Sequence, residues 1–312
     1  MSNNILLVGA GFAGRAILPY LAELYDDVHV ISRSKYYFNE YKNIHTHVAH
    51  LDDEILLHKL LPVCNTILYY AWDSTPGKTA LKPQFEFNAN LIPLIRFLET
   101  LQNFSDRHLF FLSSGGTVYG NTTSKATTED LPFHPRSYYA ASKISSEAFL
   151  TAFGRQTDNQ ITILRPSNFY GIGQPYIKGF GLIRAVFEHL LNNTTLEIWG
   201  DGSAKRDYLY IEDFISANLL LLNHPPISNV QIFNVSSGDY ASINEICETI
   251  EKISGRQLNK IYKPTRTVDL FNISIDSNKL RSLGWAPKTN LTTGLTYMWE
   301  WLCKIQSPAI NQ

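Results

Sequence analysis

Short apolar runs alternate with longer amphipathic stretches along the first half of the chain. The runs are aliphatic or β-branched, as in buried strands, and they cover residues 5–8, 28–31, 66–70, 108–112 and 161–164. The stretches between them have apolar residues at helical spacing and predict helices over residues 12–25, 53–61, 84–102 and 139–153. Pro19 lies inside the first of these helices, where we expect a kink. Strands that alternate with helices indicate βαβ units and a parallel sheet.

The pattern loses its regularity after residue 167, where glycines and prolines interrupt short segments. An apolar helix is predicted over residues 212–223, and the strand-like run that follows it, 232–235, is expected to return to the first sheet. Two more helices are predicted over residues 242–254 and 291–303. The chain is therefore expected to form a larger α/β domain and a smaller C-terminal cap. The larger domain comprises residues 1–167 with 206–236 returning to it, and the cap comprises residues 168–205 and 237–312.

Composition narrows the class of protein. The chain has 312 residues, of which 44% are hydrophobic and 18% charged, with 27 basic against 28 acidic side chains. That balance disfavours disorder and leaves no basic field for nucleic-acid phosphates. No apolar stretch approaches the ~18–20 residues of a membrane helix. Three widely spaced cysteines favour a reduced, cytoplasmic protein, and the nine histidines show no metal-binding spacing, so no metal site is predicted.

A glycine-rich turn follows the first strand and opens the first helix. It consists of Gly9, Gly11 and Gly14, with Phe12 and Ala13 between the last two. Glycines in this context permit a tight turn and a close approach of the backbone to a pyrophosphate, which the helix N-terminus stabilises. The turn predicts a dinucleotide-binding site in a doubly wound parallel sheet of the Rossmann type.

The end of the second strand carries the information on cofactor choice. An NAD site usually has Asp or Glu there, whereas this chain has Ser32, Arg33 and Ser34. A guanidinium and two hydroxyls suit a 2′-phosphate, so NADP(H) is favoured. In the alternative, Arg33 lies in solvent, Ser32 binds the ribose hydroxyls, and NAD(H) is accepted as well.

A second group of motifs points to catalysis. Tyr139 and Lys143 are four residues apart on a predicted helix, which places the phenol and the ammonium on one face. Residues 113–120, Ser-Ser-Gly-Gly-Thr-Val-Tyr-Gly, follow a predicted strand. Downstream lie Leu-Arg-Pro-Ser-Asn-Phe-Tyr-Gly at 164–171, Trp-Gly-Asp-Gly-Ser at 199–203, Arg-Asp-Tyr at 206–208 and Leu-Gly-Trp-Ala-Pro at 283–287.

Taken together, these motifs resemble an extended short-chain dehydrogenase/reductase of the nucleotide-sugar epimerase/dehydratase group. The resemblance runs from about residue 5 to residue 301. It implies that Tyr139 is the general acid/base and that Lys143 tunes its pKa and binds the cofactor ribose. It also implies cofactor contacts from Ala71, Trp72, Asn90, Ser113 and Pro166.

For the substrate, the resemblance implies a nucleotide sugar held in the C-terminal cap. Arg206 and Arg266 match positions that clamp the diphosphate, with Asn168 donating nearby and Asp269 near the nucleoside. The base is not readable from the sequence. A homodimer that pairs the helices near 84–102 and 139–153 is also implied.

This chain departs from the family pattern at Gly115. Relatives carry a Ser or Thr there that hydrogen-bonds the sugar hydroxyl, and Gly115 has no side chain. Ser114 and Thr117 are the nearest substitutes, although neither occupies the matching position. At Gly116 and Thr117, relatives that catalyse elimination carry an acidic pair, so a dehydratase is disfavoured.

Three functions stay open. The first is an NADPH-dependent 4-keto-reductase acting on a nucleotide-activated hexose, in keeping with the residues after the second strand. The second is a UDP-hexose type 4-epimerase that retains its NAD. The third is a non-catalytic NADP-binding sensor, which the presence of both Tyr139 and Lys143 disfavours.

Overall fold

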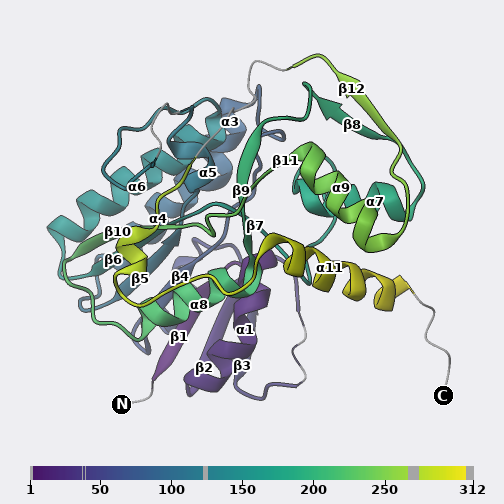
Figure 1. The fold of residues 1–312 in the computed structure, drawn as a ribbon. Helices are drawn as coiled ribbons and strands as arrows, with labels where there is room; N and C mark the ends of the chain where they lie inside the picture. Colours follow the sequence, from purple (N-terminus) through teal and green to yellow (C-terminus); the bar gives the residue numbers. More distant parts are fainter. Residues whose placement is uncertain (1–2, 37, 39, 122–125, 266–273, 307–312) are drawn as a thin grey trace.

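A computed structural model describes residues 3–36, 38, 40–121, 126–265 and 274–306 of the chain. A large parallel sheet, covered by helices on both faces, forms the greater part, and a smaller assembly of helices and short strands lies beside it (Figure 1). Among the described helices, none has both the length and the apolar composition needed to cross a membrane.

The large sheet has seven strands in the order β10-β6-β5-β4-β1-β2-β3, and every neighbouring pair is parallel. Their bounds in chain order are β1 (Asn4–Val8), β2 (Asp27–Ser32), β3 (Ile44–Val48), β4 (Cys64–Tyr69), β5 (His108–Leu112), β6 (Gln160–Pro166) and β10 (Val230–Val235). The chain runs outward from β1 to β3 and then returns to β4 on the other side of β1. This reversal makes the sheet doubly wound and leaves a crevice at the carboxyl ends of β1 and β4, where such sheets bind ligands. The expected Rossmann-type α/β fold is confirmed.

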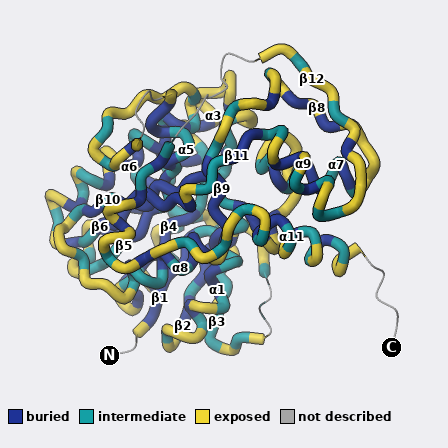
Figure 2. Tube along the Cα trace, in the orientation of Figure 1, coloured by how far each residue is buried: buried dark blue, intermediate teal, exposed yellow. Residues whose placement is uncertain are grey.

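Alternate residues of β1 pack on opposite faces, as strand geometry requires. Ile5 and Leu7 join a core with the helices α1 (Phe12–Leu24) and α8 (Ile211–Leu222). Leu6 and Val8 join a second core on the other face. The helices of that second face are α2 (Glu54–Leu60), α4 (Ile92–Leu101) and α6 (Tyr138–Gln156). Figure 2 shows the central strands buried between the two helical layers.

The smaller part is built around two short sheets. One contains β11 (Tyr240–Ser242), β9 (Lys205–Tyr210) and β7 (Asn168–Tyr170), and the other contains β12 (Lys260–Lys263) and β8 (Leu196–Trp199). Its helices are α7 (Leu182–Leu191), α9 (Ile243–Ser254) and α11 (Leu291–Gln306). The short helix α10 (Asn278–Arg281) packs instead on β10 of the large sheet, although residues 237–312 were expected in the cap. Between these segments, β10 returns to the large sheet and pairs with β6, as the strand-like run predicted.

The helix expected over residues 84–102 is not a uniform α-helix. It consists of α3 (Pro83–Glu86), a π-helical segment η1 (Phe87–Leu91) and α4. Pro93 accounts for the change, because it has no N–H to donate to the carbonyl four residues earlier. The wider turn is marked by the hydrogen bond from the Ile92 N–H to the Phe87 carbonyl. By contrast, α1 runs from Phe12 to Leu24 with Pro19 inside it.

A buried ion pair fixes α6 against the sheet. The Arg165 side chain on β6 and the Glu147 side chain on α6 are 2% and 3% exposed, and the Nη2–Oε2 distance is 2.6 Å. Arg165 also donates to the Tyr119 hydroxyl at 2.7 Å, and the Tyr119 hydroxyl donates to Asn234 on β10 at 2.6 Å. The pair therefore connects α6 to β6 directly. Through Tyr119, at the end of the short helix α5 (Gly115–Val118), it also connects α6 to β10.

We predict that Glu147→Ala lowers the free energy of unfolding by about 3–5 kcal/mol, because it leaves the Arg165 guanidinium buried without a counter-ion. Denaturant unfolding provides the measurement. Glu197→Ala is the matched control, since Glu197 and Lys263 form an exposed pair 3.7 Å apart, and such pairs contribute about 1 kcal/mol or less. A loss at Glu147 no larger than the control loss would contradict the structural role given to the buried pair.

Candidate active site

Tyr139 and Lys143 lie in the first turns of α6. The helix begins after Ser137, whose side chain accepts a hydrogen bond from the Ala140 N–H at 3.1 Å. This N-cap fixes the start of the helix and hence the direction of both side chains. Lys143 is buried, and its Nζ donates to the Leu112 carbonyl at the end of β5 at 2.6 Å.

The Lys143 ammonium lies against aromatic rings. Its Nζ is 3.5 Å from the ring centroid of Trp72, 4.9 Å from that of Phe111 and 5.9 Å from that of Tyr139. Ring faces attract cations, so these contacts offset part of the cost of burying the charge. Burial still lowers the pKa of Lys143 well below its usual value, and the carboxylates of Glu86 and Glu147 act in the opposite direction.

The Tyr139 phenol is in contact with the same group of side chains. Its ring meets Trp72 edge-on, with centroids 6.1 Å apart. Burial raises the pKa of Tyr139 above its usual value near 10, an interaction with the Ser114 side chain lowers it, and the Glu86 carboxylate raises it. A phenol in this state is a proton donor, and it needs nearby positive charge to act as a base.

Gly115 is the position where the family pattern has a hydroxyl, and the backbone here excludes one. A Cβ on Gly115 would lie 2.6 Å from the Arg165 carbonyl oxygen. Ser114 is therefore the hydroxyl that reaches Tyr139, whereas the Thr117 hydroxyl donates to the Ser114 carbonyl at 3.4 Å. A Cβ on the next glycine, Gly116, would make an ordinary contact of 3.5 Å with Asn168.

The three glycines of the turn have different roles in the structure. Gly9 has φ +106°, a conformation that favours glycine, and a Cβ there would lie 2.5 Å from the Ala71 nitrogen. A Cβ on Gly14 would lie 2.1 Å from the Gly9 carbonyl oxygen, so α1 packs directly on the turn. A Cβ on Gly11 would have nothing within 4 Å. Close packing at two glycines and open space at the middle one fit a turn that admits a pyrophosphate.

The first turn of α1 completes an anion-binding end. Gly11 is its N-cap and provides no side-chain hydrogen bond, and the turn, which starts with Phe12 and Ala13, has no acidic residue. The N–H groups of that turn are therefore suited to a phosphate. The residues present fit a dinucleotide cofactor.

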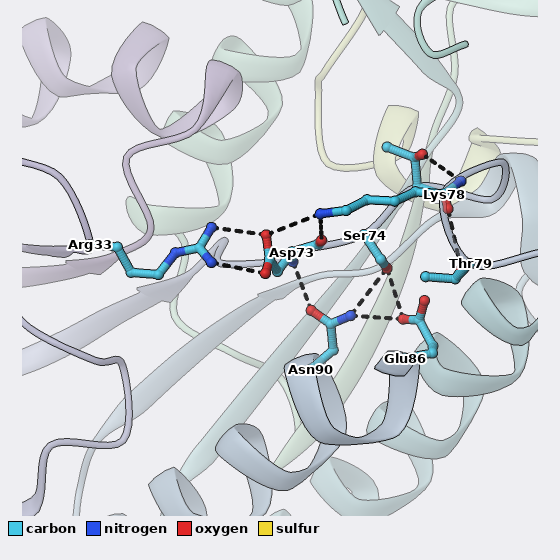
Figure 3. A network of polar contacts seen from close by, with 8 residues as sticks. Arg33, Asp73, Ser74, Lys78, Thr79, Glu86 and Asn90 are labelled. Carbon is cyan, nitrogen blue, oxygen red and sulfur yellow. Dashed lines mark hydrogen bonds and ion pairs between the residues drawn. The ribbon is translucent and has the colours of Figure 1, made fainter. Parts of the chain in front are cut away.

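Arg33 does not project freely toward this site. Its guanidinium donates to both carboxylate oxygens of Asp73, at 2.8 and 2.9 Å, and Lys78 Nζ lies 3.6 Å from the same carboxylate (Figure 3). Arg33 follows β2 and Asp73 follows β4, so the pair spans the end of β1, which lies between those strands. Ser32 ends β2, and its hydroxyl donates to the carbonyl of Ser34 in the segment that follows.

Asn90 is at the centre of a buried polar network at the base of the loop after β4 (Figure 3). Its Oδ1 accepts from the Asp73 N–H at 2.7 Å, and its Nδ2 donates to Ser74 Oγ at 3.1 Å and to Glu86 Oε1 at 2.8 Å. Ser74 Oγ also donates to Glu86 Oε1 at 2.8 Å. The network ties η1 to the loop after β4.

Four further predicted residues are described, two of them near the end of β6. The Ser113 hydroxyl donates to Glu147, Pro166 ends β6, and the Asn168 side chain donates to the Asp207 carbonyl at 3.1 Å. Arg206 lies beside Asp207 on β9. Arg266 and Asp269 lie outside the described residues.

The sequence did not single out Asp73 or Glu86. Asp73 pairs with Arg33, which follows a different strand, so no local spacing relates the two. The signal available for Glu86 was an acidic residue four positions before Asn90 in a helical pattern, a spacing that places the two on one face.

The sheet, its switch point and the glycine turn define a dinucleotide-binding α/β enzyme. The profile of the NAD dependent epimerase/dehydratase family matches residues 5–236, and the chain belongs to that family. Its members and relatives include enzymes that act on nucleotide sugars, and this chain is an NAD-dependent enzyme of that type.

The relatives do not all have the same activity. UDP-glucose 4-epimerase of Mycolicibacterium smegmatis is 32% identical over 214 residues, which are 68% of each chain. The dTDP-4-dehydro-6-deoxyglucose reductase of Escherichia coli is 27% identical over 307 residues, covering 94% of this chain and 95% of the relative. The structure of UDP-glucose 4-epimerase with UDP-glucose from Thermotoga maritima has a TM-score of 0.89 and 28% identity, and the match covers 97% of this chain and 99% of that chain.

We predict that alanine at Gly14 affects the stability of the fold, whereas alanine at Gly11 affects cofactor binding. Gly14→Ala should destabilise the fold, because its Cβ collides with the Gly9 carbonyl. Gly11→Ala should leave the melting temperature unchanged and weaken NAD binding, because its Cβ enters the open space above the turn. Thermal unfolding and calorimetric titration with NAD measure the two properties. Unaltered NAD affinity in Gly11→Ala would place the pyrophosphate elsewhere.

Proposed function

We propose that this protein is a nucleotide-sugar 4-epimerase that keeps NAD bound, with a UDP-hexose as the substrate class. The observation that carries the proposal is the Arg33–Asp73 ion pair. A preference for NADP(H) was the main reason to expect a reductase, and it required Arg33 to face a 2′-phosphate. With both arms of its fork on a carboxylate, Arg33 offers that phosphate a neutralised partner. The names of the relatives include more epimerases than reductases, which supports the same choice.

The residues that would hold NAD are the glycine turn, Ala71, Asn90 and Lys143. When bound, NAD supplies a hydride acceptor that can return the hydride to the same sugar carbon. Lys143 contributes a positive charge close to Tyr139, and the Trp72 ring packs against both side chains. In this proposal Tyr139 takes the proton of the sugar hydroxyl and gives it back, with Ser114 as its hydrogen-bonding neighbour.

Binding of the sugar nucleotide is proposed for the C-terminal cap, residues 168–205 and 237–312, together with β9, which was expected to return to the larger domain but pairs with β7 and β11 in the smaller part. Asn168 and Arg206 lie near the carboxyl edge of the large sheet, and Arg206 is suited to a diphosphate. Arg266 and Asp269 keep the roles that the family resemblance implies. The homodimer and the cytoplasmic location remain predictions. The family resemblance also implies a part in cell-surface polysaccharide biosynthesis.

The second candidate is the NADPH-dependent 4-keto-reductase. The relative named dTDP-4-dehydro-6-deoxyglucose reductase favours it, because the match spans nearly both chains. The two activities separate in one respect: a reductase consumes its cofactor, and an epimerase turns over without added cofactor. A protein that binds the cofactor and turns over neither substrate would be the non-catalytic sensor.

We predict that Tyr139→Phe lowers the rate of UDP-glucose to UDP-galactose conversion by ~10²–10⁴-fold, the usual loss when a general acid/base is removed. NAD binding should change little. The neighbouring Tyr138 is 44% exposed, so Tyr138→Phe is the matched control and should retain its rate. Near-normal turnover by the Tyr139 variant would refute the assignment of the proton to this residue.

We predict that the wild-type protein binds NAD more tightly than NADP, and that Asp73→Asn increases NADP affinity by about tenfold or more. The reason is that the freed Arg33 fork can bind a 2′-phosphate through charge-assisted hydrogen bonds of about 1.5–3 kcal/mol each. The double variant Arg33→Ala/Asp73→Asn should lose that gain. Titration of both cofactors against wild type, Asp73→Asn, Arg33→Ala and the double variant is the measurement. If wild type prefers NADP(H) and Arg33→Ala alone removes the preference, the reductase takes first place.

A further inference from the structure

Glu86 is a buried carboxylate that the proposed reaction does not yet use. It is the last residue of α3 and is 2% exposed. Its Oε1 accepts hydrogen bonds from Ser74 and Asn90, both at 2.8 Å. Its Oε2 is buried and has no hydrogen-bond partner among the described residues. Figure 3 shows the carboxyl group of Glu86 beside the Ser74 and Asn90 side chains.

A carboxylate in this setting needs a positive charge nearby. Neutral hydrogen-bond partners satisfy one oxygen, but they do not compensate the cost of removing a charge from water. Lys143 has the complementary need, because its Nζ donates to a neutral carbonyl and otherwise meets aromatic rings. The helices that carry the two residues, α3 and α6, pack against each other.

The other charges around Lys143 do not meet this need. Glu147 lies one turn further along α6, but both of its oxygens accept hydrogen bonds from Arg165, so that pair is close to neutral. On the neighbouring elements, η1 contributes the neutral Asn90, and α4 carries Arg96 and Glu99, which are both exposed. Among the described residues, Tyr139 is a further titratable group close to Lys143, whose Nζ is 5.9 Å from its ring centroid.

We propose that Glu86 is a positioning residue that holds Lys143 in its ammonium form and thereby keeps the Lys143–Tyr139 pair competent for proton transfer. The proposal rests on the proposed function for its catalytic meaning, although the charge state of Lys143 can be measured without turnover. The hydrogen bonds from Ser74 and Asn90 fix the Glu86 carboxyl group, so Asn90 supports the proton-transfer pair as well as the loop after β4.

The electrostatic balance agrees with this role. Burial lowers the pKa of Lys143, and Glu86 is the strongest of the groups that raise it. Glu86 also raises the pKa of Tyr139, so in this proposal Glu86 assists proton transfer through the Lys143 ammonium and not through a direct effect on the phenol. Without Glu86, Lys143 would lose its proton at a lower pH, and activity that requires the ammonium would be lost as the pH rises through that lower value.

The test is a pH titration of Lys143 by NMR in protein labelled with ¹³C at lysine Cε, with the resonance assigned by Lys143→Arg. Glu86→Gln should lower the pKa of Lys143 by about one unit or more, the usual effect of removing a neighbouring opposite charge. Glu99→Gln removes the same charge from an exposed position of α4 and should have no effect. A Lys143 pKa that is equal in Glu86→Gln and Glu99→Gln overturns the proposal.

Glu86→Asp covers the case in which the Gln variant fails to fold. It keeps the charge but withdraws it by one methylene, so the pKa of Lys143 should fall below the wild-type value, and no fall at all would contradict the proposal. In turnover assays, the alkaline limb of the pH–rate profile should move to lower pH in parallel with the NMR value. If the wild-type protein turns over no nucleotide sugar, the proposed function fails, while the NMR comparison still decides the role of Glu86.

Discussion

The burial of the Lys143 ammonium is the constraint on which the site depends. A charged amine inside a protein must be compensated, and here the compensation comes from several elements at once. The carbonyl end of β5 accepts its hydrogen bond, the loop after β4 supplies Trp72, and α3 supplies a buried carboxylate. Each of these segments lies at the carboxyl edge of the large sheet, so the position of one cation connects the fold to its chemistry.

Two ion pairs and one proposed charge interaction at this edge differ in burial, and burial decides what each contributes. Arg165 and Glu147 are almost fully buried and mutually hydrogen-bonded, which makes them a structural connection between α6 and β6. Arg33 is 61% exposed and Asp73 32% exposed, so their pair adds little stability, and its proposed role is to lower the positive charge offered to a cofactor phosphate. Lys143 and Glu86 are buried with only neutral hydrogen-bond partners, and an arrangement of that kind suits a group whose charge matters for reaction.

The sequence predicted those features that depend on local pattern. Apolar periodicity located six of the seven strands of the large sheet, and glycine spacing located the turn whose three glycines have distinct packing roles. The missing strand, β3, reads Ile-His-Thr-His-Val and lacks an apolar run. The partners of Arg33 and Lys143 could not be predicted in the same way. Asp73 is forty residues from Arg33, and no short-range spacing relates Glu86 to Lys143. The packing at Gly115 could not be predicted from local pattern either, because the Arg165 carbonyl that excludes a side chain there comes from β6.

The central claim is that the protein is a nucleotide-sugar 4-epimerase that retains NAD. The most direct test follows a labelled hydrogen through one turnover. The purified protein is incubated, without added cofactor, with UDP-glucose that carries deuterium at C4 of the sugar, and the product is examined by mass spectrometry and NMR. If NAD stays bound and returns the hydride while Tyr139 transfers only the hydroxyl proton, the product is UDP-galactose with the deuterium still at C4. Conversion with loss of that deuterium to solvent would contradict the account. The absence of conversion, together with consumption of NADPH in the presence of a 4-keto sugar nucleotide, would also contradict it.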